Sequence, residues 1–121
     1  MKYNYTSNLD INEKVMIAIV RVSERYKKDS ASIFRNYGLT FAQYAALRVL
    51  ESSVNGQNTI SNVGRVMLVS GANMTGIARR LEKNGFLIRK KDPRDDRITL
   101  LQITPKGMQS LKNIEVENDT L

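Results

Sequence analysis

The chain has 121 residues, enough for one domain with a hydrophobic core and too few for two. It contains no cysteine and no histidine, which excludes disulfides, thiolate zinc sites and the most common general base and metal ligand. Nineteen basic residues against twelve acidic ones give a formal net charge of +7. This excess favours a polyanionic partner, most simply nucleic acid, with an anionic membrane surface as the competing interpretation.

The sequence also argues against membrane insertion and catalysis. No apolar run approaches the roughly 20 residues that span a bilayer, and the first residues lack the apolar core of a signal peptide. We therefore expect a cytoplasmic protein with no membrane partner. No glycine-rich phosphate-binding motif occurs, so we expect no cofactor and no metal. An enzyme that uses carboxylates, lysine or tyrosine is the least favoured class, because no cluster of such groups is visible.

The first predicted element is a long amphipathic helix over residues 10–37, followed by a stop signal at Gly38. Asp29 and Ser30 interrupt its apolar stripe, which leaves a break in the helix open. A small domain cannot easily cover such a stripe, so we expect a dimerisation helix. The alternative is packing against the chain's own later helices, which accounts for part of the stripe. The stripe consists of Ile11, Val15, Ile19, Val22 and Tyr26.

Three more helices are predicted in the first two thirds of the chain. Thr40 begins one through a capping box with Gln43, and an Asn-Gly turn ends it. A short helix over residues 61–67 follows. After a three-residue link, Ser70 is the expected N-cap of a helix over residues 70–84. The short helix, link and third helix have the dimensions of a helix-turn-helix. In the helix after Thr40, the spacing predicts that Tyr44, Leu47, Leu50 and Val54 face the core.

The helix over residues 70–84 has two contrasting faces. Met74, Ile77, Ala78 and Leu81 form the apolar face. The opposite face has small and hydrogen-bonding residues in its N-terminal half and cations in its C-terminal half: Ala72, Thr75, Gly76, Arg79, Arg80 and Lys83, with Asn73 on the flank. A helix that enters a major groove needs this division, because small side chains let the backbone approach base edges. A solvated face that happens to be basic is the alternative.

Glycine inside an exposed helix costs about 1 kcal/mol relative to alanine, so Gly76 favours the groove interpretation. Relief of a crowded helix contact is the other explanation for Gly76.

A β-hairpin is predicted after this helix, with strands over residues 86–91 and 98–103. The charged loop 92–97 joins them, and Pro93 ends the first strand because it cannot donate to a ladder. Residues 65–97 hold nine basic and four acidic side chains. The positive charge is therefore concentrated on the basic helix and the hairpin.

Four ordered motifs occur between residues 38 and 107. They are Gly38-Leu39-Thr40 with Gln43-Tyr44; Arg80-Leu81-Glu82-Lys83-Asn84-Gly85-Phe86-Leu87 with Arg89; Asp95-Asp96-Arg97; and Ile103-Thr104-Pro105-Lys106-Gly107. Together they resemble the winged helix-turn-helix of the MarR family of bacterial transcriptional regulators. The resemblance implies a mostly α fold with a small β-hairpin wing, that is, a winged helix-turn-helix with flanking dimerisation helices.

The resemblance also implies a dimeric, often ligand-responsive repressor that binds a pseudo-palindromic site in double-stranded DNA. The recognition helix would enter the major groove, and the wing over residues 92–97 would lie against the minor groove or backbone. Asp95 would orient the wing or neighbouring arginines by ion pairing; the alternative is a turn residue that satisfies local backbone N–H groups. The candidate DNA-binding residues are Ser70, Ala72, Asn73, Thr75, Gly76, Arg79, Arg80, Lys83, Arg94 and Arg97.

The C-terminus departs from the family pattern. Only fourteen residues follow Gly107, whereas family members typically continue through a long fifth helix and a sixth, both in the dimer interface. Thr104 and Pro105 are a suitable N-cap and N1 pair, and Met108, Leu111 and Ile114 form a short apolar edge. We expect one domain over residues 1–121, in which the long helix over 10–37, the lobe over 39–107 and a helix stub over 108–121 follow one another. Dimerisation would then rest on the first helix and the stub, or be weak, or use other surfaces.

The resemblance implies a pocket for a small aromatic or anionic effector between the dimer helices and the DNA-binding lobe. Tyr26, Tyr37, Tyr44 and Arg48 have suitable chemistry. Tyrosine on an apolar stripe is more often part of a core, so no residue is assigned to ligand binding. A second function also stays open, in which a shortened paralogue acts mainly through protein partners without binding an operator.

Overall fold

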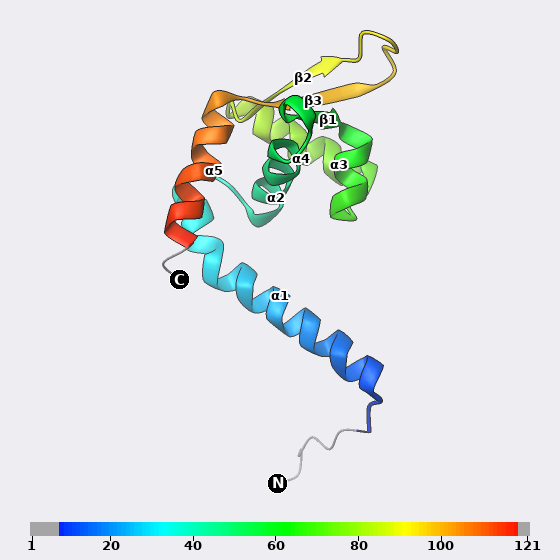
Figure 1. Cartoon of the computed structure of the whole chain (residues 1–121), viewed down its shortest axis with the longest axis vertical. Coiled ribbons are helices and arrows are strands. Elements are labelled where there is room, and N and C mark those ends of the chain that lie inside the picture. Colours follow the sequence, from blue (N-terminus) through cyan, green and yellow to red (C-terminus); the bar gives the residue numbers. More distant parts are fainter. Residues whose placement is uncertain (1–7, 119–121) are drawn as a thin grey trace. The chain divides into compact units, whose positions relative to one another are not determined.

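The computed structural model describes residues 8–118 and divides the chain into two compact units, Met1–Ser30 and Ala31–Leu121. The predicted mostly helical fold with a small antiparallel sheet is confirmed (Figure 1). In chain order the elements are α1 (Ile11–Asn36), α2 (Phe41–Glu51), the 3-10 turn η1 (Val54–Gly56), β1 (Gln57–Thr59), α3 (Ile60–Met67), α4 (Gly71–Lys83), β2 (Leu87–Lys91), β3 (Thr99–Ile103) and α5 (Pro105–Asn118).

Helix α1 runs without the break that the sequence left open. The Ser30 hydroxyl donates to the Tyr26 carbonyl at 2.6 Å, so the polar side chain is satisfied within the helix. The helix ends as predicted at Gly38, whose φ is +74°. The Leu39 amide then donates to the Phe34 carbonyl at 3.0 Å, which is the hydrogen bond of a Schellman motif.

The unit Ala31–Leu121 has its own hydrophobic core. Phe34, in the last turns of α1, is fully buried, and its ring stacks on Tyr44 with the centroids 4.5 Å apart. The helices α2 to α5 and the sheet each contribute fully buried side chains, so this unit closes its core from its own residues. Those side chains include Leu47, Leu50, Val63, Met74, Leu81, Leu87, Leu101, Leu111 and Ile114.

Local signals set the start of α2 as predicted. The Gln43 amide donates to Thr40 Oγ1 at 3.1 Å, and the Thr40 amide donates to Gln43 Oε1 at 3.0 Å, which completes the capping box. The end of α2 was predicted less well. The helix stops at Glu51, so Val54 lies in η1 and is 82% exposed instead of facing the core.

The sheet contains one strand that the sequence analysis missed. Its order is β1-β3-β2, and both pairs are antiparallel. The predicted hairpin of β2 and β3 is present, with Leu87 opposite Ile103 and Lys91 opposite Thr99. Strand β1 has only three residues, all polar, and exists because it pairs with β3. So short a segment has no hydrophobic period of its own to read.

Two glycines allow close packing around the sheet and the helix-turn-helix. A Cβ atom on Gly64 in α3 would lie 3.3 Å from the Val69 carbonyl oxygen and 3.4 Å from Met74 Cγ. A Cβ atom on Gly107 in α5 would lie 2.5 Å from the Phe86 carbonyl oxygen. The first glycine brings α3 close to α4, and the second brings the start of α5 against the beginning of β2.

Candidate nucleic-acid interface

Helices α3 and α4 form a helix-turn-helix whose turn is closed by backbone hydrogen bonds (Figure 1). Leu68 follows α3 in the left-handed region with φ +56°, and the Val69 amide donates to the Gly64 carbonyl at 2.9 Å. Ser70 caps α4 as predicted, because its side chain accepts from the Asn73 amide at 3.4 Å. The turn between the helices is therefore tightly defined.

Helix α4 has the two faces that its sequence predicts. Met74, Ile77, Ala78 and Leu81 are buried against the core. On the other side, Thr75 and Gly76 are half-buried. The remaining candidate residues of this helix and its cap are exposed: Ser70, Ala72, Asn73, Arg79, Arg80 and Lys83. The structure therefore brings the eight recognition-helix candidates together on one solvent-facing surface.

The local geometry of this surface bears on Gly76 and Thr75. A Cβ atom on Gly76 would meet nothing closer than the Arg80 guanidinium, at 3.8 and 3.9 Å. A crowded helix contact therefore does not explain this glycine. The Thr75 hydroxyl donates to the Gly71 carbonyl at 3.0 Å, so its proton is committed to the helix while its oxygen remains an acceptor.

The wing is the loop between β2 and β3, and Asp95 organises its second half. This carboxylate accepts from the Arg97 amide at 3.0 Å and pairs with the Arg97 guanidinium through Nε at 3.0 Å and Nη2 at 2.9 Å. Asp95 therefore makes both the backbone hydrogen bond of a turn residue and an ion pair with Arg97, and its role in orienting the wing stays a prediction. The side-chain hydrogen bonds from Arg97, supported by its amide, hold the pKa of Asp95 below its ordinary value.

The other wing cation, Arg94, is also exposed, and its amide donates to Asp92 Oδ1 at 2.7 Å. The structure therefore places both predicted wing arginines at the surface of one short loop.

Another ion pair, which the sequence did not predict, joins α4 to strand β2. Arg89 in β2 donates through Nε to Glu82 Oε1 at 2.9 Å, and its amide donates to Glu82 Oε2 at 3.3 Å. The side-chain hydrogen bond from Arg89 lowers the pKa of Glu82. The sequence does contain a signal, since opposite charges seven residues apart flank the helix stop at Gly85.

The charge distribution around the helix-turn-helix is one-sided. No acidic residue occurs between Ser52 and Leu81, a stretch that includes all of α3 and most of α4, whereas three arginines do. On the hairpin, Lys90 donates to Gln102 at 2.7 Å and Lys91 donates to the Asp96 carbonyl at 3.1 Å, so neither ammonium is neutralised by a carboxylate there. An uncompensated positive surface of this kind attracts a polyanion.

Residues 39–99 match the model of the MarR family, which is just over half of the chain. The chain belongs to the MarR family. Over 98 residues it is 36% identical to the HTH-type transcriptional regulator YkoM of Bacillus subtilis. That alignment covers 80% of this chain and 59% of YkoM, so the chain spans less than two thirds of this relative.

Solved MarR-type structures share this fold. The regulator Sco5413 of Streptomyces coelicolor has a TM-score of 0.75 and 27% identity, over 88% of this chain and 74% of that one. AbfR, solved in its reduced form bound to DNA, has a TM-score of 0.73 and 23% identity, over 86% of this chain and 74% of AbfR. These similarities confirm the winged helix-turn-helix architecture.

The side chains considered for an effector are largely engaged with other groups. The Tyr37 hydroxyl donates to Glu117 Oε1 at 2.5 Å, which raises the pKa of Tyr37, and Arg48 pairs with Glu51 at 2.7 Å. Tyr44 stacks on Phe34, as described above. These contacts give Tyr37, Arg48 and Tyr44 structural roles within the unit Ala31–Leu121.

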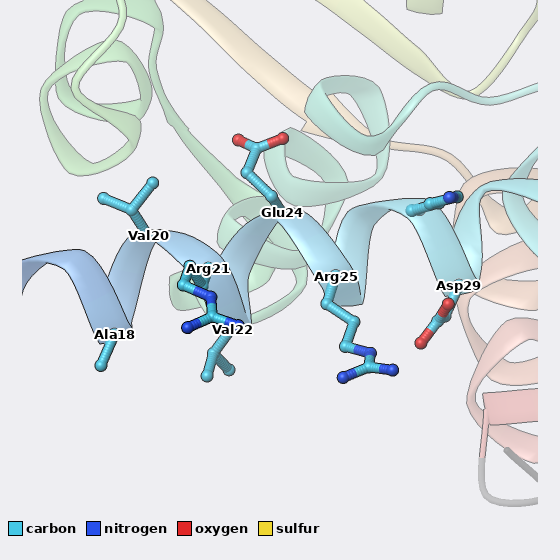
Figure 2. Close-up of a pocket in the computed structure, with 8 residues that line it drawn as sticks. Ala18, Val20, Arg21, Val22, Glu24, Arg25 and Asp29 are labelled. Atoms are coloured by element: carbon cyan, nitrogen blue, oxygen red, sulfur yellow. The ribbon is translucent and has the colours of Figure 1, made fainter. Parts of the chain in front are cut away.

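A hollow lies along α1, lined by residues between Ala18 and Asp29. Figure 2 shows Val20 and Glu24 on one side of the helix, and Ala18, Val22 and Arg25 on the other. The side chains diverge from one helix instead of converging on an enclosed space. A single chain therefore does not form a ligand-binding cavity here from these residues alone.

Two further findings concern residues 8–118. No helix among them is long and apolar enough to cross a bilayer. Their acidic side chains form no group of three or more that could hold a metal ion.

Proposed function

We propose that the chain is a sequence-specific transcriptional regulator that binds double-stranded DNA. The observation that carries this proposal is the solvent-facing surface of α4, which combines low bulk at its N-terminal half with cations at its C-terminal half. The acid-free segment around it and the exposed wing arginines support the same function. AbfR, a protein of the same fold, has been solved bound to DNA, and YkoM is named a transcriptional regulator rather than an enzyme.

The proposed roles divide along α4. Asn73 and Thr75 read base edges in the major groove, because both offer hydrogen-bonding groups and Gly76 keeps the backbone accessible. Ser70 and Ala72 lie at the same end, where the uncapped amides of the helix favour a phosphate. The cations of the C-terminal half neutralise phosphates and position the helix without selecting a sequence. They are Arg79, Arg80 and Lys83.

The wing is proposed to contact the minor groove or backbone through Arg94 and Arg97. The bidentate pair with Asp95 restricts the Arg97 guanidinium before DNA arrives, so less conformational freedom is lost on binding. Asp95 would then act as a positioning residue for Arg97 instead of touching the duplex itself.

A homodimer is proposed to present two such lobes to a pseudo-palindromic site. The stripe of α1 supports it, because Ile11, Ile19 and Val22 are 71%, 64% and 69% exposed. A second copy that covers this stripe would remove apolar surface from water and fix the lobes about one helical turn of DNA apart. In this proposal the helix over 10–37 dimerises, the lobe over 39–107 binds DNA, and the segment 108–121 supports both.

A cytoplasmic, ligand-responsive repressor is the proposed physiological form. It rests on the resemblance to the MarR family and on the cations that line the hollow of α1. Arg21, Arg25 and Lys28 would suit a small aromatic or anionic effector once a second copy closes that hollow.

The test is selection from a randomised duplex pool, followed by affinity measurements on the selected site at several salt concentrations. We expect a pseudo-palindromic sequence and an affinity that falls steeply with salt. Asn73→Ala and Thr75→Ala should change the selected sequence, whereas Arg79→Ala should weaken binding to all sequences. Lys112→Ala, which removes an exposed cation from α5, is the control and should change neither.

The competing function, a protein-interaction module without an operator, predicts no sequence-selective binding at any salt concentration. Recovery of the parental site by the Asn73 and Thr75 variants would instead remove those two residues as readers and leave the function intact.

A further inference from the structure

Leu68, the turn residue between α3 and α4, combines two unfavourable features. Its φ of +56° places a branched, bulky residue in the left-handed region that glycine and asparagine prefer. Its side chain is also 93% exposed, so almost none of its apolar surface is removed from water. Neither feature stabilises the isolated fold.

The fold does not use the leucine side chain to make this turn. The Leu68 amide donates to the Arg65 carbonyl at 3.2 Å, and the Val69 amide donates to the Gly64 carbonyl at 2.9 Å. Both hydrogen bonds belong to the backbone, and glycine at position 68 would form them without strain. Its two neighbours in sequence, Met67 and Val69, are the residues that pack against the core. The side chain of Leu68 is therefore available to something outside the chain.

The residues near Leu68 in the sequence indicate what kind of partner its side chain contacts. It lies two residues before the N-cap of α4, next to the end proposed to enter the groove, and within the stretch that contains no acidic residue. Val66, at the end of α3, is exposed as well. An exposed apolar side chain that lies in sequence between Arg65 and the N-cap Ser70 fits a duplex, whose phosphates are anionic but whose thymine methyls and deoxyribose carbons are apolar.

We propose that Leu68 is a DNA-contacting residue that packs on a thymine methyl or a deoxyribose beside the N-terminus of α4. The inference rests on the proposed DNA-binding function and adds an apolar contact to its polar ones. The backbone strain at Leu68 is tolerated because the contact needs this side chain at this position, and strain of this kind collects at functional sites.

The experiment measures thermal unfolding and affinity for the selected site in Leu68→Gly and Leu68→Asn. Both replacements tolerate the left-handed backbone, so the melting temperature should stay the same or rise. The affinity should fall about tenfold, which is the loss expected when a partly buried leucine contact disappears. Because stability and affinity move differently, a merely structural leucine cannot produce this result.

Val54→Asn is the matched control. Val54 is 82% exposed and lies in the same acid-free stretch, but in η1, outside the helix-turn-helix. Its turn abuts the end of β3 away from the wing loop, since a Cβ atom on Gly56 would lie 2.9 Å from Ile103. Val54→Asn should leave the affinity for the selected site unchanged.

Replacement of single thymines by uracil in the site distinguishes the two apolar sources. If Leu68 packs on a methyl group, one such replacement lowers the affinity of the wild type for the site but not that of Leu68→Gly. If Leu68 packs on deoxyribose, no replacement lowers the affinity of the wild type alone. If the wild type binds DNA and both Leu68 variants bind it with the same affinity as the wild type, this inference is overturned while the proposed function stands. A fall in melting temperature in both variants would also overturn it. So would variants that lose self-association but keep their affinity for DNA. A wild type that binds no DNA would overturn the proposed function itself.

Discussion

The unit Ala31–Leu121 and the first turns of α1 differ in what happens to their apolar side chains. In the unit Ala31–Leu121, helices and sheet bury a continuous core from Ile33 to Ile114. Along residues 11–26, a helix of the same amphipathic kind leaves its valines and isoleucines exposed. An amphipathic period therefore predicts a helix reliably, but it does not identify the surface against which the apolar face packs, whether in the same chain or in a second copy.

The stability of the unit Ala31–Leu121 should depend heavily on Phe34. Phe34→Ala removes a fully buried ring that stacks on Tyr44, and we expect the lobe to lose about 3–5 kcal/mol of unfolding free energy. Urea denaturation followed by circular dichroism measures this loss. Val116→Ala, at an exposed position of α5, is the control and should change stability by less than about 0.5 kcal/mol. Equal effects of the two substitutions would mean that the lobe does not close its own core.

The stripe of α1 should behave in the opposite way. Ile19→Glu puts a charge in its centre, so we expect the dimer to dissociate while the lobe keeps its circular dichroism spectrum. Loss of the linked second lobe should lower the affinity for a palindromic site by about 100-fold. Light scattering gives the mass of the same samples. Lys14→Glu, a larger charge change outside the stripe, is the control and should leave a dimer. A monomeric wild type at tens of micromolar would contradict the proposal.

Within the lobe, the wing should contribute affinity without specificity. Arg97→Ala removes one exposed cation from the wing, so we expect the slope of log affinity against log salt to fall by about one unit for every sequence. Fluorescence anisotropy on the selected site and on an unrelated duplex measures this change. Arg35→Ala, which removes an exposed cation from the last turn of α1, is the control. An unchanged slope in Arg97→Ala would show that the wing does not touch DNA.

The smallest effect concerns the protonation of Asp95. Its pKa is lowered by Arg97, so the stabilisation from this pair is fully present above the ordinary pKa of about 4 and is lost as the pH falls through the lower folded value. Carboxyl chemical shifts measured from pH 2 to 6 should show Asp95 titrating below that ordinary value. In Arg97→Ala the pKa of Asp95 should move up toward its ordinary value, because the guanidinium is lost while the amide of residue 97 still donates. The same midpoint in both proteins would mean that the ion pair does not persist in solution.

The parts of the fold that rest on neighbouring residues were predictable from the sequence. The capping box at Thr40, the N-cap at Ser70 and the stops at Gly38 and Gly85 are local signals, and each marks a helix end in the structure. The two faces of α4 follow from a strong 3.6-residue period, so the surface with the candidate residues was also predictable. The DNA contacts of those residues remain predictions.

The missed features lie at strand pairings and at turns between elements, which the period of a single helix or strand does not describe. Strand β1 becomes a strand only because β3 supplies its partner, and Val54 is exposed because α2 ends early. The pair of Glu82 and Arg89 depends on how the chain turns back after α4. The left-handed backbone of Leu68 runs against the intrinsic preference of leucine, so no propensity rule would assign it. Of these features, β1 needs a partner strand distant in sequence, whereas the others arise where one element ends and the next begins.

The close approach at Gly107 has a mechanical consequence. Besides that contact, the Thr104 hydroxyl donates to the Gly85 carbonyl at 2.6 Å and the Lys106 ammonium donates to the Asn84 carbonyl at 2.6 Å. These bonds tie the start of α5 to Asn84 and Gly85, the two residues that follow α4, and the space that a methyl group on Gly107 would need is already filled. This connection is therefore stiff, so a tilt of α5 at its start would also move the C-terminal end of α4.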